Sequence, residues 1–125
     1  MGEIVRRIKG EAFDSEVMLS SLPVVMDFYG DGCPPCEVVS PILEGLAMEY
    51  EGRVKFLKLN LDDEDRFSQG LVESLTLRSV PTVVFFNGRT VMDRVVGVVP
   101  KESFRQRIEG LVNRVRNPED SPSSS

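Results

Sequence analysis

Two cysteines, Cys33 and Cys36, are the residues whose type and spacing could do chemistry. They are the only cysteines among 125 residues, and they stand in the run Cys-Pro-Pro-Cys. In a helix this spacing is about one turn, close enough for the two sulfurs to form a disulfide. A pair of cysteines in a reducing compartment indicates redox chemistry or a soft metal ion rather than a structural crosslink.

Several other chemistries are excluded by composition. The chain has no histidine, which removes the usual partner of a nucleophilic cysteine or serine. Two cysteines cannot supply a zinc site with four thiolates. A metal or cluster shared by Cys33 and Cys36 of two chains stays open as the least favoured hypothesis. We therefore expect no bound cofactor and no metal.

The elements around Cys33 would activate it. The nearly continuous apolar run 24–29 predicts a central strand that is covered on both faces. Gly30-Asp31-Gly32 predicts a loop, and apolar residues at helical spacing over 38–50 predict a helix that Pro41 should kink. Cys33 would then stand at the start of a helix, where free N–H groups and the helix dipole favour its thiolate, which is the nucleophile.

The rest of the chain predicts an α/β fold. Asn87-Gly88 between two apolar runs is a strong hairpin signal. The expected order is βαβαβαββα, which implies a central mixed sheet of about five strands with helices on both faces. The remaining elements are a strand in 4–9, a helix in 13–22, a strand in 54–61, a helix in 67–75 and a final helix in 104–115.

Composition also predicts the domain layout and excludes some partners. We expect one domain over residues 1–116 and a disordered Ser/Pro-rich tail over 117–125. With 15 Lys and Arg against 20 Asp and Glu, the net charge is −5. This argues against nucleic acids and anionic membranes as partners, and it favours a soluble monomer. The N-terminus shows no signal-peptide pattern, so we expect a cytoplasmic protein.

Several short motifs together resemble the thioredoxin family over residues 13–115. They stand in the family's order and are the Cys-Pro-Pro-Cys run, Met26-Asp27-Phe28-Tyr29, Ser40-Pro41-Ile42-Leu43, Lys58-Leu59-Asn60-Leu61-Asp62, Val80-Pro81-Thr82, Asn87-Gly88 and Val96-Gly97. The resemblance implies the thioredoxin fold and the reduction of disulfides in target proteins, with a flavin-dependent reductase restoring the dithiol. No bound cofactor is needed for that activity.

The resemblance also implies roles for individual residues. Cys33 would be the exposed attacking cysteine and Cys36 the shielded resolving cysteine. Asp27 would be a buried carboxylate that helps to deprotonate Cys36, with Lys58 as its cationic neighbour. The substrate would contact a cis-proline and residues around it, namely Pro81, Val80, Gly97, Gly32, Pro34 and Pro35. Plainer readings compete with these roles: a solvated strand-edge aspartate, a surface lysine and a trans-proline.

This sequence departs from the family around the two cysteines. Gly32 stands where thioredoxins usually have Trp, Pro34-Pro35 where they have Gly-Pro, and Glu37 where they have Lys. The prolines at the first two helix positions donate no N–H, which leaves only that of Cys36 near the Cys33 sulfur. Asp31 and Glu37 add negative charge, so the thiol pKa should rise. The dithiol is then poorly stabilised, which predicts a reductant.

Two other differences from the family concern the recognition of partners and the conformation of the backbone. The loss of the indole at Gly32 should broaden or shift the choice of partner. Thr76 stands where the family often has glycine. The alternatives to a reductase are a non-catalytic thioredoxin-fold binding module and a disulfide oxidase or isomerase.

Overall fold

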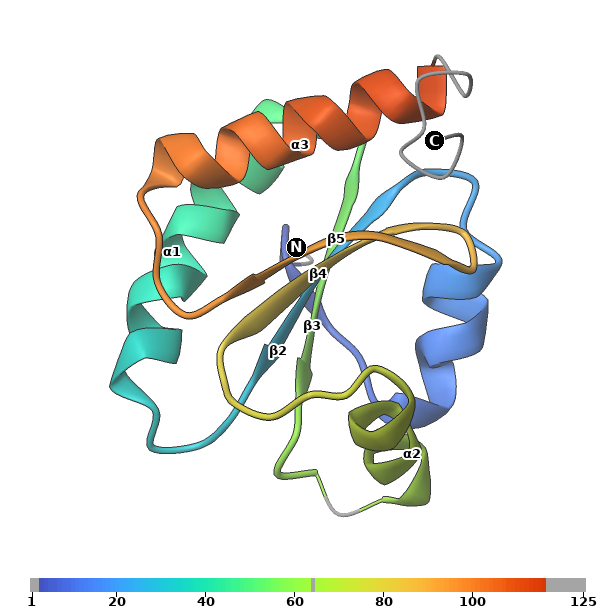
Figure 1. The fold of residues 1–125 in the computed structure, drawn as a ribbon, viewed down its shortest axis with the longest axis vertical. Helices are drawn as coiled ribbons and strands as arrows, with labels where there is room; N and C mark the ends of the chain where they lie inside the picture. Colours follow the sequence, from blue (N-terminus) through green and yellow to red (C-terminus); the bar gives the residue numbers. More distant parts are fainter. Residues whose placement is uncertain (1–2, 64, 117–125) are drawn as a thin grey trace.

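The computed structural model describes residues 3–63 and 65–116, and the expected tail over 117–125 lies outside them. The domain boundary at residue 116 therefore stays a prediction. A five-stranded mixed sheet forms the centre, with strand order β1-β3-β2-β4-β5 (Figure 1). Strands β1, β3 and β2 are parallel, and β4 and β5 add to them as an antiparallel hairpin. The strands are β1 (Arg6–Arg7), β2 (Val24–Tyr29), β3 (Lys55–Asn60), β4 (Thr82–Asn87) and β5 (Thr90–Val96).

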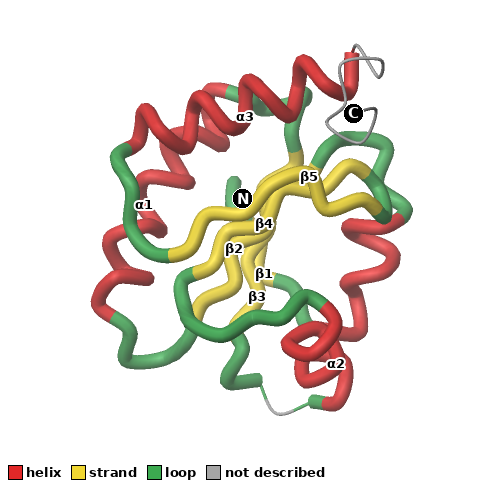
Figure 2. The backbone as a smooth tube through the Cα atoms, in the orientation of Figure 1, coloured by secondary structure: helices red, strands yellow, loops and turns green. Residues whose placement is uncertain are grey.

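Helices cover both faces of the sheet, as predicted. Helices α1 and α3 lie on one side, and α2 and the N-terminal helical segment lie on the other (Figure 2). The helical elements are η1 (Gly10–Ala12), η2 (Asp14–Met18), α1 (Pro34–Glu49), α2 (Arg66–Ser74) and α3 (Lys101–Arg116). Among the described residues, no helix is long and apolar enough to cross a bilayer.

Two predicted N-terminal elements need correction. The strand expected in 4–9 is only Arg6–Arg7, an edge strand that pairs with Leu57 and Lys58 of β3. The helix expected in 13–22 starts earlier and is irregular, with a 3-10 turn followed by a π-helical turn. The N–H of Leu19 bonds to the carbonyl of Asp14, and this five-residue spacing widens the turn.

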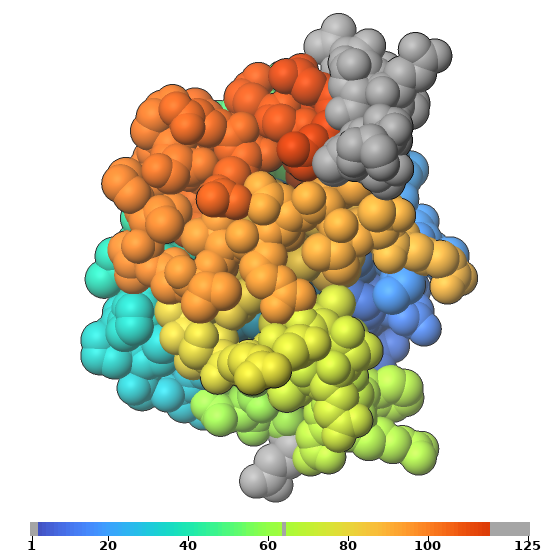
Figure 3. Space-filling view, viewed as in Figure 1, coloured from blue at the N-terminus to red at the C-terminus, as the bar shows by residue number. Residues whose placement is uncertain are grey.

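Alternation along β2 divides the core into two layers. Val25 packs with α1 and α3, whereas Val24, Met26 and Phe28 pack with the other layer. Successive side chains of a strand point to opposite faces. Asp27 therefore points to the α1 side, beneath the start of that helix. In the space-filling view, side chains of β5 and α3 (orange) close over the sheet above those of α2 (yellow-green) (Figure 3).

The segment between α2 and β4 is held at both ends. At its start, the Arg94 guanidinium donates hydrogen bonds to the carbonyls of Leu75 (2.5 Å) and Thr76 (3.3 Å). At its end, the Thr82 hydroxyl donates to the Ser79 carbonyl at 2.7 Å. These bonds join the end of α2 to β5 and fix the approach to β4.

Replacing Thr76 with glycine should stabilise the fold by about 1 kcal/mol. Thr76 has a φ of 53°, a left-handed conformation that costs a β-branched residue about 1–3 kcal/mol. Glycine adopts it freely but loses about 0.5–1 kcal/mol through the entropy of the unfolded chain. Urea unfolding measures the difference. Thr90→Gly, at an exposed position in β5, should destabilise the protein, and a loss of stability in Thr76→Gly would contradict the strain argument.

Candidate active site

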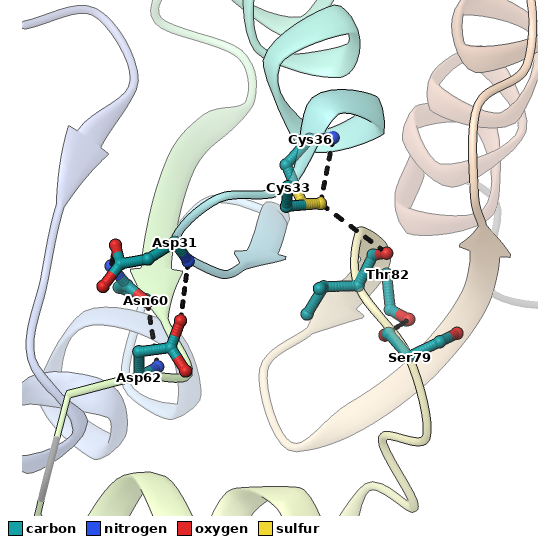
Figure 4. Close-up of a disulfide and its surroundings, with 8 residues drawn as sticks. Asp31, Cys33, Cys36, Asn60, Asp62, Ser79 and Thr82 are labelled. Atoms are coloured by element: carbon teal, nitrogen blue, oxygen red, sulfur yellow. Dashed lines mark hydrogen bonds between the residues drawn. A yellow bond between two sulfur atoms is a disulfide. The ribbon is translucent and has the colours of Figure 1, made fainter.

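Cys33 and Cys36 form a disulfide at the first turn of α1 (Figure 4). Cys33 has an extended backbone and caps the helix, and its sulfur accepts a hydrogen bond from the Cys36 N–H at 3.2 Å. Pro34 and Pro35 occupy the first two helix positions, as predicted, so neither donates to the sulfur. The Cα atoms of the cysteines are 5.3 Å apart, a separation that a disulfide spans.

The two cysteines differ little in exposure. Cys33 is 8% exposed and Cys36 is 5% exposed. The expected contrast between an exposed and a shielded cysteine is therefore slight in the disulfide form. What distinguishes Cys33 is its surroundings, since its sulfur lies 3.9 Å from the carbonyl oxygen of Val80 in the segment before β4.

The peptide bond between Val80 and Pro81 is cis, which agrees with the expectation from the family and excludes the trans reading. Gly97 lies next to Pro81, because its N–H bonds to the Pro81 carbonyl at 2.9 Å. The structure thus brings Val80, Pro81 and Gly97 together next to the Cys33 sulfur.

Gly32 has a backbone reason to be glycine. Its φ is 57°, which side chains other than glycine rarely adopt, and a Cβ there would meet no atom within 4 Å. The position is therefore open at the rim of the site.

Asp27 is buried at 3% exposure, so the reading of a solvated strand-edge residue is wrong. Its Oδ1 atom has no hydrogen-bond partner among the described residues. Burial raises the pKa of Asp27 to about 7, and the positive charge of Lys58 opposes this rise. The carboxyl group is therefore poised to change protonation near neutral pH.

Lys58 lies beside Asp27 in the parallel register of β2 and β3. Its ammonium group is 3.5 Å from a carboxylate oxygen of Glu3, and within the described parts of the chain no ion pair joins it to Asp27. Lys58 also lines a pocket of about 270 Å³ together with Asp27 and Cys36, so its role as the cationic neighbour of Asp27 stays a prediction. The acidic residues Asp31 and Glu37 line the same pocket.

The sequence analysis did not predict that three polar residues beside the cysteines bond to one another. Asp31, Asn60 and Asp62 form a closed set of hydrogen bonds where β2 and β3 end (Figure 4). A usable signal was present, because parallel neighbouring strands end at the same edge of a sheet and both ends carry polar residues.

Comparisons with known proteins agree with this geometry. The family model described as Thioredoxin matches residues 4–110. Thioredoxin 1 of Nostoc sp. (strain PCC 7120) is 35% identical over 103 residues, which cover 82% of this chain and 92% of that protein. The thioredoxin of Synechocystis sp. has the same identity and coverage. The chloroplastic M-type thioredoxin of Pisum sativum is 36% identical over 108 residues, 86% of this chain and 60% of that protein. The chain belongs to the thioredoxin family, and its Cys33–Cys36 pair is the redox centre of a thioredoxin-type dithiol–disulfide oxidoreductase.

Proposed function

We propose that this protein reduces disulfides in target proteins, with Cys33 as the attacking residue and Cys36 as the resolving residue. The observation that carries the proposal is the disulfide at the start of α1, with the Cys33 sulfur facing the Val80 carbonyl. In the dithiol form the Cys33 thiolate attacks one sulfur of the target disulfide, and the other leaves as a thiolate. The Cys36 thiolate then attacks Cys33, which forms the observed disulfide and releases the reduced target. Two electrons pass to the target, and no bound cofactor is needed.

Asp27 would accept the proton of the Cys36 thiol. The two residues line one pocket of about 270 Å³, which is large enough for bridging water. With a pKa of about 7, Asp27 can take up a proton at neutral pH. Lys58 lines the same pocket, and its positive charge would favour the ionised form of Asp27.

The target would lie as an extended segment beside the cis-proline. The backbone of Val80 offers hydrogen bonds there, Pro81 supports it, and Gly97 lets the segment approach. On the other side of the disulfide, Gly32 leaves space for bulky target residues. Pro34 and Pro35 would form the apolar edge of this binding surface at the start of α1.

The site favours the role of a reductant. The Cys33 sulfur accepts a single N–H, that of Cys36, from the first turn of α1. The carboxylates of Asp31 and Glu37 lie around the same pocket. Few donors and nearby negative charge destabilise a thiolate, and a poorly stabilised dithiol gives up its electrons readily.

The partners would be proteins with accessible disulfides and a thioredoxin-reductase-like enzyme that restores the dithiol. A cytoplasmic location fits this role, because reductases of this kind work where thiols are kept reduced. The M-type thioredoxins among the relatives carry the word chloroplastic in their names, and that location belongs to those proteins.

Equilibration with glutathione and dithiothreitol buffers tests the proposed direction. We expect the Cys33–Cys36 couple to be more reducing than the cytosolic glutathione pool, whose potential is roughly −220 to −320 mV depending on the method. Alkylation followed by mass measurement gives the fraction of dithiol, which suits a chain without tryptophan. A potential above that range would identify an oxidase or isomerase instead. Glu37→Gln removes one of the two carboxylates and should make the couple less reducing.

A further inference from the structure

The loop that carries Cys33 is tied to the sheet by a closed set of three hydrogen bonds, which we call the Asp31–Asn60–Asp62 ring. The Asp31 N–H donates to Asp62 Oδ2 at 2.6 Å, and the Asp62 N–H donates to Asn60 Oδ1 at 2.9 Å. The Asn60 amide nitrogen closes the ring by donating to Asp31 Oδ1 at 2.9 Å (Figure 4).

The ring has a rigid side and a loop side. Asn60 is 5% exposed and pairs with Tyr29 at the last position of the β2–β3 register. The Leu61 N–H bonds to the Tyr29 carbonyl at 2.8 Å, which extends this pairing. Asp31, in contrast, is exposed and stands two residues before Cys33. The ring therefore restrains the residues before the attacking sulfur, because it bonds them to the ordered central strands.

The loop also fits closely between the ring and the substrate side of the site. A Cβ built on Gly30 would lie 3.2 Å from Asp62 Oδ2 and 3.4 Å from a methyl carbon of Val80. Beyond Asp31 the chain has no comparable support, because Gly32 has no side chain and its surroundings are open. The ring is the last fixed point before Cys33.

We propose that Asn60 and Asp62 are positioning residues, which hold the loop so that the Cys33 sulfur faces the backbone of Val80. The inference rests on the proposed function, in which the target lies along Val80. When the disulfide is reduced, the bond between the two sulfurs no longer restrains Cys33, and the ring remains to hold its loop. Displacing a reacting group by about 1 Å can slow a reaction about a hundredfold. A partly loosened loop should therefore slow the attack of Cys33 on the target disulfide about tenfold.

The test measures how fast the reduced full-length protein reacts with each of two disulfides. One is a peptide disulfide long enough to lie along Val80, and the other is hydroxyethyl disulfide, which needs no groove. Asp62→Ala should lower the second-order rate constant for the peptide about tenfold, and that for hydroxyethyl disulfide less than about twofold. The ratio of the two rate constants cancels any change in the thiolate fraction of Cys33, so it reports position rather than pKa.

A conservative variant separates geometry from charge. Asp62→Asn keeps an oxygen that accepts the Asp31 N–H but removes the carboxylate charge, so its rate ratio should stay within about twofold of the wild type. Equal losses in Asp62→Asn and Asp62→Ala would overturn the positioning role in favour of a charge effect. Glu51→Ala removes an exposed carboxylate in the turn after α1 and should leave the ratio unchanged.

A second variant keeps the test decisive if Asp62→Ala unfolds. Asp31→Ala affects an exposed side chain, so the fold should persist while the Asn60 bond is lost. Its rate ratio should fall by at least about twofold, since one of the three ring bonds is removed. An unchanged ratio would overturn the inference. If the wild type itself shows no preference for the peptide, the proposed binding of targets along Val80 fails instead, which is a different result.

Discussion

Replacing Cys36 with serine should stop turnover after the first half of the reaction and leave the target protein covalently attached to Cys33. Serine cannot displace the target from the mixed disulfide, because a hydroxyl is a far weaker nucleophile than a thiolate. Mass measurement after incubation of the reduced variant with a protein disulfide should show a one-to-one adduct, and steady-state reduction should fall by at least about a thousandfold.

Cys33→Ser is the matched control for this experiment. It removes the attacking sulfur and leaves Cys36, which lies in the first turn of α1 and lines the pocket of Asp27, whereas Cys33 is the cysteine whose sulfur faces Val80. We expect neither turnover nor an adduct. Turnover by Cys36→Ser at the rate of the wild type, or an adduct on Cys36 in Cys33→Ser, would show that the assignment of the two roles is wrong.

Replacing Asp27 with asparagine should stabilise the protein at alkaline pH. The pKa of Asp27 is raised from 3.8 to about 7 in the folded state by burial. Between these values the folded protein binds more protons than the unfolded chain, so this residue makes stability fall as the pH rises from about 4 to about 7. A pKa difference of about 3 corresponds to about 4 kcal/mol, which is the upper bound of the gain in Asp27→Asn.

Urea unfolding at several pH values measures this effect. At about pH 4 the variant and the wild type should have similar free energies of unfolding. The difference between them should grow until about pH 7 and then stay constant. Asp14→Asn, which changes an exposed aspartate, is the matched control. A difference in the free energy of unfolding that is largest at acidic pH would contradict the raised pKa of Asp27. We also expect Asp27→Asn to reduce disulfides more slowly, since an amide cannot accept the proton of the Cys36 thiol.

The parts of the fold that the sequence predicts best are those whose pattern is set locally. The apolar run 24–29, the helix from Pro34 and the Asn87-Gly88 hairpin each appear where predicted. The first strand and first helix are less regular than expected, because edge pairing with β3 and packing against the sheet determine them. Local periodicity carries no information about those distant contacts.

The residues of the site also divide into those whose placement follows from local pattern and those whose placement depends on distant contacts. The burial of Asp27 follows from its place inside an apolar strand, and the placement of Pro34 and Pro35 follows from helix geometry. The proximity of Lys58 to Asp27 depends on the register between β2 and β3, and the resemblance to a family supplied it. The Asp31–Asn60–Asp62 ring joins residues about thirty positions apart and depends on the same register. No pattern within one segment determines such a register.

The two anchors of the segment between α2 and β4 have a consequence for how targets are bound. Arg94 holds its start and the bond from Thr82 to Ser79 holds its end, so the Val80 backbone is ordered before any target arrives. Association with an already ordered segment avoids the entropy loss of ordering a flexible loop, which otherwise weakens binding. In the proposed binding mode, the protein can therefore engage many different sequences through the main chain alone without first ordering this segment.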